Sequence, residues 1–348
     1  MAEIVLGIGT SHSPQVSAPV AGWTDFVASD QARSTLVLRG EKYTFDELVE
    51  LRAAAGIAGD LGMEAWRRMH AASQAAIAEL SRTLAEAAAD VVIIVGDDQD
   101  EVLHEDNQPA VLVYWGEDIH GRPRHYADSV AAGIRAAGWA FGEVERDYPV
   151  ASGLGRFVIE ELTKAQFDVA SSRRLPGHSA MGHAFAFVYR RLMDREIVPT
   201  LPVMLNTYLP PNQPTPGRCY ALGRALRAAV EAWPGNERVA VVASGGLSHF
   251  VIDEELDQLV LTAIRDRDED SLAAIPREWF VSGTSETLNW ITAAGAVEHL
   301  DMELLDYVPG YRTPAGTGCA MAFARWRPAG WAADPAAGRA AAESGGAQ

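Results

Sequence analysis

The chain has 348 residues, of which 48% are hydrophobic and 22% charged, and these proportions are ordinary for a globular protein. Its 47 acidic and 29 basic residues give a formal charge of −18, which repels phosphate backbones and argues against a nucleic-acid partner. Two cysteines argue against a disulfide scaffold, the N-terminus lacks a basic signal-peptide region, and no apolar run reaches the roughly 20 residues that cross a bilayer. We therefore expect a cytoplasmic protein with no membrane contact.

Short apolar runs rich in β-branched residues predict buried strands at residues 4–8, 91–95, 110–114, 198–205 and 239–243. Continuous runs of this kind are typical of strands that helices cover on both faces. Between them lie helical patterns, at residues 63–88, 154–165, 184–193 and 218–233, and most of 253–293 is helical in pattern. Alternation of strand and helix predicts an α/β fold with a mixed or parallel central sheet flanked by helices on both faces.

Two segments stand outside this alternation. Residues 21–62 break the rhythm and contain Thr44 and Glu47 at the spacing of a helix capping box. We interpret them as an inserted helical segment that covers the site. Residues 328–348 are rich in Ala and Gly without periodicity, and we expect them to be disordered. Length alone permits two domains, but the pattern favours a single core domain over residues 1–327.

Histidines stand at the ends of two predicted strands, where ligands bind in open α/β sheets. His12 lies in GTSHSP (residues 9–14) and His249 in SGGLSH (residues 244–249), where the glycine pair permits a sharp turn. His12 taken alone is equally well explained as an ordinary loop histidine. A strand followed by Gly-Gly and a histidine is a more specific pattern, and it favours a functional role for His249.

Two acidic segments could complete a site with these histidines. The run GDDQDE (residues 96–101) holds four carboxylates, which repel one another unless a cation or solvent relieves them. It is therefore either a solvated loop or part of a cation site. Glu286 stands at a predicted helix start, where the macrodipole alone favours a glutamate.

His183 precedes an apolar helix and could line the same cleft, and His178 is a weaker candidate nearby. We expect only surface or packing roles for the four histidines His70, His120, His125 and His299. Two or three imidazoles with one carboxylate at separate strand ends suggest a non-haem iron(II) site, which leaves positions open for substrate and dioxygen. Such a site also needs a base for a phenolic proton.

The segments GTSHSP, SGGLSH, ETLNW (residues 286–290) and NTYLPPNQPTP (residues 206–216) together resemble the class III extradiol dioxygenases. This superfamily includes the catalytic subunit of protocatechuate 4,5-dioxygenase and the gallate and methylgallate dioxygenases. The similarity runs from residue 1 to about residue 327, apart from the insertion at about residues 21–62. It implies a ring-cleaving enzyme that uses Fe(II) and O2 on a catechol- or gallate-type aromatic substrate, and it implies a homo-oligomer.

Carried over to this chain, the resemblance implies that His12 and Glu286 are iron ligands and that His249 is the catalytic acid/base. It places His183 near substrate and oxygen. At the second strand end the family has a histidine ligand, whereas this chain has Gln99, a weaker donor to iron(II). Three interpretations remain open: Gln99 binds through its carbonyl, His104 or Glu101 replaces it, or the site has lost its metal.

Two other functions compete with a ring-cleaving dioxygenase. Gln99 is compatible with a non-catalytic binding or regulatory protein on the same fold, and the same ligands could activate water on zinc in a hydrolase. Aromatic residues that could pack on a ring are Trp23, Tyr208 and Tyr311, and Arg218 is the candidate for binding an acidic group of the substrate.

Overall fold

The computed structural model describes residues 1–331 except 125, 129, 142–143, 178 and 194–195. In it, the buried apolar runs form the centre of a mixed sheet. The strands of the sheet are β1 (Glu3–Thr10), β4 (Val91–Asp97), β5 (Val111–Tyr114), β8 (Ala170–Ser172), β9 (Thr200–Leu205), β10 (Arg238–Ser244), β11 (His249–Val251), β12 (Asp301–Tyr311) and β13 (Thr317–Arg327). Their order is β11-β13-β1-β10-β4-β9-β5-β8, and β12 also pairs with β13. The four central strands β1, β10, β4 and β9 are parallel, whereas β13 and β5 join them antiparallel.

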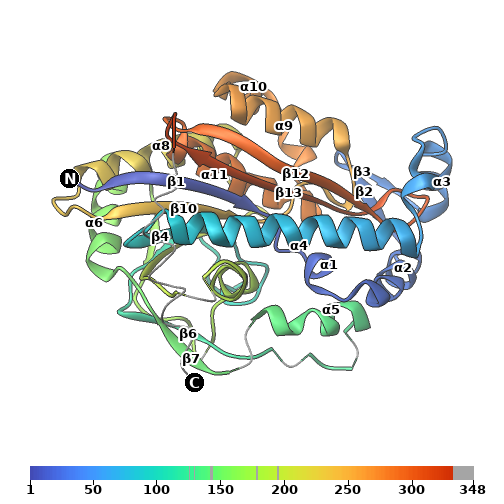
Figure 1. Ribbon diagram of the computed structural model, residues 1–348, viewed down its shortest axis with the longest axis horizontal. Helices are drawn as coiled ribbons and strands as arrows, with labels where there is room; N and C mark the ends of the chain where they lie inside the picture. Colours follow the sequence, from blue (N-terminus) through green and yellow to red (C-terminus); the bar gives the residue numbers. More distant parts are fainter. Residues whose placement is uncertain (125, 129, 142–143, 178, 194–195, 332–348) are drawn as a thin grey trace.

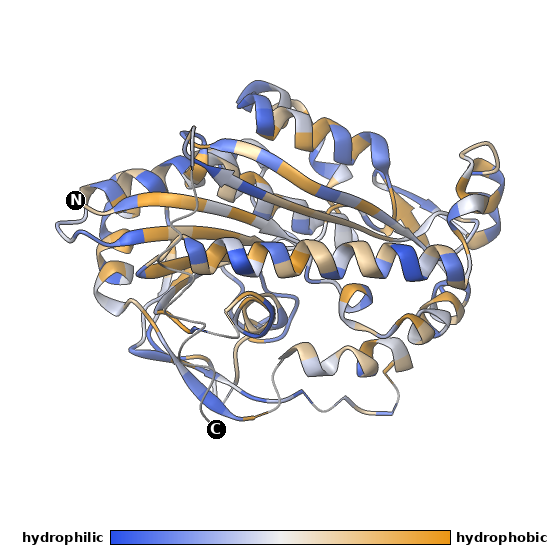
Figure 2. Cartoon of the chain, viewed as in Figure 1, coloured by the Kyte–Doolittle hydropathy of each residue, from blue (hydrophilic) through white to orange (hydrophobic). Residues whose placement is uncertain are grey.

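Helices cover both faces of this sheet, which explains why the central strands are apolar throughout. Along β4, Val91, Ile93 and Val95 enter one hydrophobic core, whereas Val92 and Ile94 enter the other. The first core lies under α6 (Ser152–Lys164), α8 (Pro216–Ala232) and α11 (Thr287–Val297), and the second under α4 (Met63–Glu86) and α7 (His183–Phe187). Helix α4, the long helix across the middle of Figure 1, packs against β12, β13 and β1. Figure 2 shows the apolar character of β1 and β10. The predicted α/β fold, with a mixed sheet and helices on both faces in a single core domain, is confirmed.

Helices α8 and α11 approach so closely that glycine is required where they touch. A Cβ atom on Gly295 of α11 would overlap the backbone carbonyl of Tyr220, and one on Gly223 of α8 would overlap that of Thr292. A backbone atom cannot move aside as a flexible side chain can.

We expect Gly295→Ala to destabilise the protein by about 1–3 kcal/mol, because overpacking outweighs the gain in helix propensity. The free energy of unfolding from urea titration measures this. Gly59→Ala is the matched control, since a Cβ there meets nothing within 4 Å. Equal stabilities for the two variants would contradict the close contact.

Residues 21–62 form a small lobe beside β11. They contain α2 (Trp23–Gln31), β2 (Leu36–Leu38), β3 (Glu41–Tyr43), α3 (Phe45–Leu51) and the short helix η2 (Ile57–Asp60). The predicted capping box is confirmed: Glu47 N donates to Thr44 Oγ1 over 3.3 Å, and Thr44 N donates to the Glu47 carboxylate over 2.7 Å. Leu36 packs with Val251 of β11, so the lobe reaches the strand that begins at His249. Its role as a cover for the site stays a prediction.

The remaining elements connect or cap the sheet. They are α1 (Pro14–Ser17), η1 (Val20–Gly22), β6 (Asp118–Gly121), α5 (Ala132–Ala136), η3 (Gly138–Phe141), β7 (Arg146–Pro149), η4 (Val188–Leu192), α9 (Glu254–Asp266), α10 (Glu269–Ala274), η5 (Arg277–Trp279) and η6 (Ser282–Glu286). Among the described residues, no helix is both long enough and apolar enough to span a bilayer. The predicted disorder of the tail concerns mainly residues 332–348, which lie outside the described residues.

Candidate metal centre

Four ligand-type side chains converge at the carboxyl edge of the parallel strands. His12 follows β1, Asp97 ends β4, His183 begins α7, and Glu286 directly precedes α11. The register places Thr10 beside Ser244 and Ser244 beside Gly96, so that segments far apart in sequence end at the same level. The ligand atoms of the four side chains all lie within 4.8 Å of one another.

The distances within this cluster suit a single metal ion. His12 Nε2 lies 3.0 Å from His183 Nε2 and 3.2 Å from Glu286 Oε2. Two ligand atoms bound at right angles, each about 2.1 Å from an ion, are roughly 3.0 Å apart. Asp97 is more distant, with its carboxylate oxygens 4.0 Å from the Nε2 atoms of His12 and His183. Imidazole and carboxylate donors in this number fit a first-row transition metal such as iron(II).

The hydrogen bonds of His12 fix which ring nitrogen faces the cluster. The Ser244 hydroxyl donates its one proton to the carbonyl of Ala184 over 2.6 Å. Ser244 Oγ must therefore accept from His12 Nδ1, which lies 3.0 Å away. Because Nδ1 of His12 donates to Ser244, Nε2 is the ring nitrogen that faces the cluster.

Glu101 orients His183 in the same way. Its Oε2 accepts from His183 Nδ1 over 2.6 Å and from the His183 backbone N–H over 2.8 Å, and its other oxygen is ion-paired with Arg124. Burial alone would raise the pKa of Glu101, but the charges of His183 and Arg124 lower it to about 2. Burial disfavours the charged form of His183, yet the nearby carboxylates, led by Glu101, raise its pKa to about 9.

Glu286 and His249 form the opposite side of the site. Glu286 Oε2 accepts from the backbone N–H of Gly246 over 2.7 Å, and Oε1 lies 3.1 Å from His249 Nε2. His249 Nδ1 donates to the carbonyl of Leu247 over 2.8 Å, which leaves Nε2 directed at the cluster. A Cβ on Gly283 would overlap the ring of His249, so glycine there makes room for the imidazole.

Gln99 reaches the site through its amide nitrogen. Nε2 lies 2.9 Å from Asp97 Oδ2 and 2.9 Å from Glu286 Oε1, and it donates a hydrogen bond to each carboxylate. A flipped amide would place its oxygen against two carboxylate oxygens, which is unfavourable. The contacts of Gln99 are therefore those of a donor to the cluster.

Asp97 is the residue of the cluster to which sequence reasoning gave no role. It is fully buried and accepts from Asn289 Nδ2 over 2.9 Å, and burial followed by the charge of Glu286 raises its pKa. The interpretation of GDDQDE as a solvated loop is wrong for Asp97 and Asp98, both of which are buried. The position of Asp97 at the last residue of a strand was the signal that could have singled it out.

Other sequence candidates lie away from the cluster. His104 is exposed and bonds Asp100 at 2.8 Å, and Arg218 lies over the ring of Phe167 at 3.8 Å. Trp23 and Tyr311 are buried. His125 and His178 lie outside the described residues.

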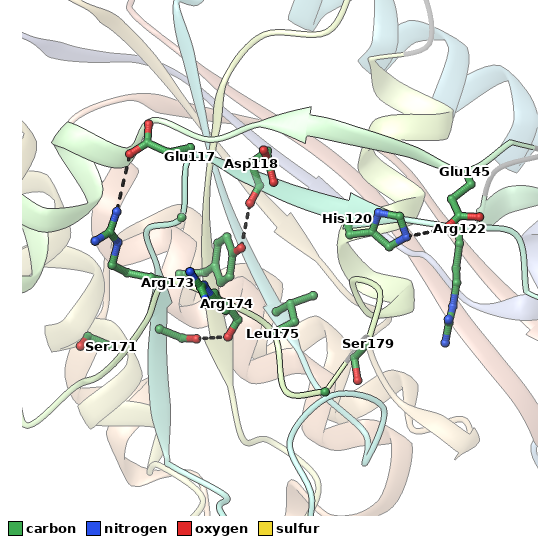
Figure 3. A pocket seen from close by; sticks show the side chains of 14 residues that line it. Glu117, Asp118, His120, Arg122, Glu145, Ser171, Arg173, Arg174, Leu175 and Ser179 are labelled. Atoms are coloured by element: carbon green, nitrogen blue, oxygen red, sulfur yellow. Dashed lines mark hydrogen bonds and ion pairs between the residues drawn. The ribbon is translucent and has the colours of Figure 1, made fainter.

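A separate hollow of about 1120 Å³ lies beside β6. Figure 3 shows it between a basic side with Arg173 and Arg174 and a second side with His120 and Glu145. His120 is ion-paired with Glu145 and Asp147, which makes a charged rim. None of the four cluster residues is among the described residues that line this hollow.

The fold is thus a mixed α/β sheet that carries, at the carboxyl edge of its parallel strands, an imidazole–carboxylate cluster of the kind that could hold a metal ion. Residues 63–320 match the family described as the catalytic LigB subunit of aromatic ring-opening dioxygenase, and the chain belongs to this family. The chain is also 35% identical over 115 residues to a gallate dioxygenase of Pseudomonas putida (strain KT2440). That alignment covers 31% of this chain and 32% of the gallate dioxygenase.

Proposed function

We propose that this protein is an Fe(II)-dependent extradiol dioxygenase that opens the ring of a catechol- or gallate-type compound with O2. The observation that carries the proposal is the convergence of His12, His183, Asp97 and Glu286 within 4.8 Å at the edge of the sheet. The family match supports the reaction class. The likeness to a gallate dioxygenase supports a hydroxylated aromatic substrate.

The side chains divide between holding a metal and handling protons. His12 and Glu286 are proposed ligands, and bound iron(II) supplies the chemistry that lets dioxygen react with an electron-rich ring. His249 Nε2 is held at the cluster by the Nδ1 bond to the Leu247 carbonyl, and it accepts a phenolic proton and later returns one. Burial of His12, His249 and Glu286 keeps bulk water away from the reacting atoms.

The proposal also includes the substrates, the cellular compartment and the oligomeric state of the enzyme. A vicinal diol and O2 are its substrates, and the cytoplasm with its reducing conditions suits a ferrous site. A homo-oligomer stays a prediction that size-exclusion chromatography with light scattering would test.

The test combines metal analysis with oxygen uptake. Protein purified without oxygen and loaded with iron(II) is expected to hold about one iron per chain and to consume O2 with gallate, protocatechuate or catechol. His12→Ala and Glu286→Ala are each expected to lose both properties, because each removes a proposed ligand. The exposed His104→Ala is the control and keeps both.

Three outcomes would contradict the proposal. Iron-loaded protein that consumes no O2 with any vicinal diol or aminophenol is not a dioxygenase. Protein that binds no iron at all favours a binding role. An activity that persists without O2 and depends on zinc favours a hydrolase.

A further inference from the structure

The contacts of Gln99 raise the question of which side chain supplies the second imidazole of the centre. Gln99 Nε2 donates to Asp97 and to Glu286, over 2.9 Å in each case. An amide used in this way neutralises part of the charge on two carboxylates. It is not positioned to give an oxygen lone pair to the same ion as Glu286.

His183 has the geometry that Gln99 lacks. Its Nε2 lies 3.0 Å from His12 Nε2, and both rings donate a proton from Nδ1, to Glu101 and to Ser244 respectively. A proton on one of the two nitrogens relieves their repulsion when no ion is bound, and a bound cation would take the place of that proton. The spacing is also that of two neighbouring ligands on one ion, roughly 3.0 Å.

Glu101 is built to hold His183 in this orientation. It accepts two hydrogen bonds from His183, at 2.6 and 2.8 Å, and is itself held by Arg124. A Cβ on Gly182 would lie 2.6 Å from Glu101 Oε2, so a glycine at that position lets the carboxylate reach the backbone. A carboxylate that accepts from the second nitrogen of a ligating histidine is the usual partner of a metal-bound imidazole.

We propose that His183 is the second imidazole ligand of the metal centre in this chain, with Glu101 as its positioning residue and Gln99 as a hydrogen-bond donor to the carboxylates. The ligand set is then His12, His183 and Glu286. This inference rests on the proposed function for the presence of a metal, and it replaces the ligand that the family resemblance places at position 99.

The experiment measures metal binding directly, with Co²⁺ as the probe. Co²⁺ is titrated into metal-free protein under nitrogen, and affinity is read by calorimetry and ligand geometry by the visible absorption of the ion. His183→Ala is expected to weaken Co²⁺ binding by about 100-fold or more and to change the absorption bands. Glu101→Gln is expected to weaken binding by about 10–100-fold, the usual effect of losing such a partner.

Gln99→His gives the opposing test. If His183 already completes the site, a new imidazole is not needed, and the loss of two amide hydrogen bonds leaves Co²⁺ affinity equal or lower. His104→Ala is the control and binds Co²⁺ as the wild type does, because the His104 side chain is exposed and bonds Asp100, away from the cluster. Thermal unfolding of each metal-free variant shows whether it has folded.

Each outcome decides between the two proposals. Unchanged affinity and spectrum in a folded His183→Ala variant would overturn the inference, as would binding at least tenfold tighter in Gln99→His. If His183→Ala keeps the metal but loses oxygen uptake, the proposed function stands and the inference falls. If the wild type binds neither Co²⁺ nor iron, both fall.

Discussion

Replacing His249 by alanine is expected to lower the rate of oxygen-dependent ring opening by roughly 10²–10⁴-fold, the usual contribution of a general acid/base. His249 Nε2 lies 3.1 Å from Glu286 Oε1, at the edge of the cluster. Its Nδ1 bond to the Leu247 carbonyl orients the ring with Nε2 toward the cluster, and alanine offers no group that could take up a proton there. The measurement is kcat from oxygen uptake at saturating substrate.

The metal content of the variant shows whether His249 acts as an acid/base or as a metal ligand. His249→Ala should retain iron and bind Co²⁺ with wild-type affinity, whereas His12→Ala should not. The control for a generic loss of histidine is His104→Ala, with unchanged kcat. A His249→Ala variant without metal would make His249 a ligand, and one with wild-type kcat would remove it from the mechanism.

Replacing Arg312 by alanine is expected to destabilise the fold by about 3–5 kcal/mol, the cost of leaving a buried charge without its partner. Arg312 is 7% exposed and forms two hydrogen bonds to Asp30, which is 2% exposed. It also donates to Gln15 Oε1 over 2.9 Å. The loss would leave the Asp30 carboxylate with the Thr317 hydroxyl but without its cation. The measurement is the free energy of unfolding in urea.

Two further variants serve as controls for Arg312→Ala. Arg68→Ala breaks an exposed pair with Glu64, and such pairs contribute about 0–1 kcal/mol. Arg312→Met combined with Asp30→Leu removes both charges, and it should cost less than Arg312→Ala because no unpaired charge remains. A loss below about 1 kcal/mol in Arg312→Ala would show that this buried pair contributes no more than an exposed one.

The central fold could be predicted because its signals are local. The strand at residues 91–95 and the helix at residues 63–88 reappear in the structure with ends shifted by two residues, since each has an uninterrupted pattern. The strands β12 and β13 were not predicted. β13 consists largely of small residues, and β12 contains Pro309 and Gly310, so neither has the β-branched run that marks a strand.

The candidate site could be anticipated in its residue types but not in its arrangement. His12 and Glu286 were singled out by their places at a strand end and a helix start, and the structure brings them to 3.2 Å. The contacts of Asp97 and Glu101 depend on the register of β4 against its neighbours and on the approach of α7. No single segment of the sequence predicts the strand register or the approach of α7, because both arise from packing between distant parts of the chain.

The position of the cluster in the chain has a consequence for folding. His12 follows the first strand, and Glu286 directly precedes the late helix α11. An ion bound by both would therefore link segments from near the two ends of the domain. The centre can form only after nearly the whole domain has been synthesised and folded. Bound metal would then protect the entire domain against unfolding and proteolysis, by about 4 kcal/mol at a free concentration a thousandfold above its dissociation constant.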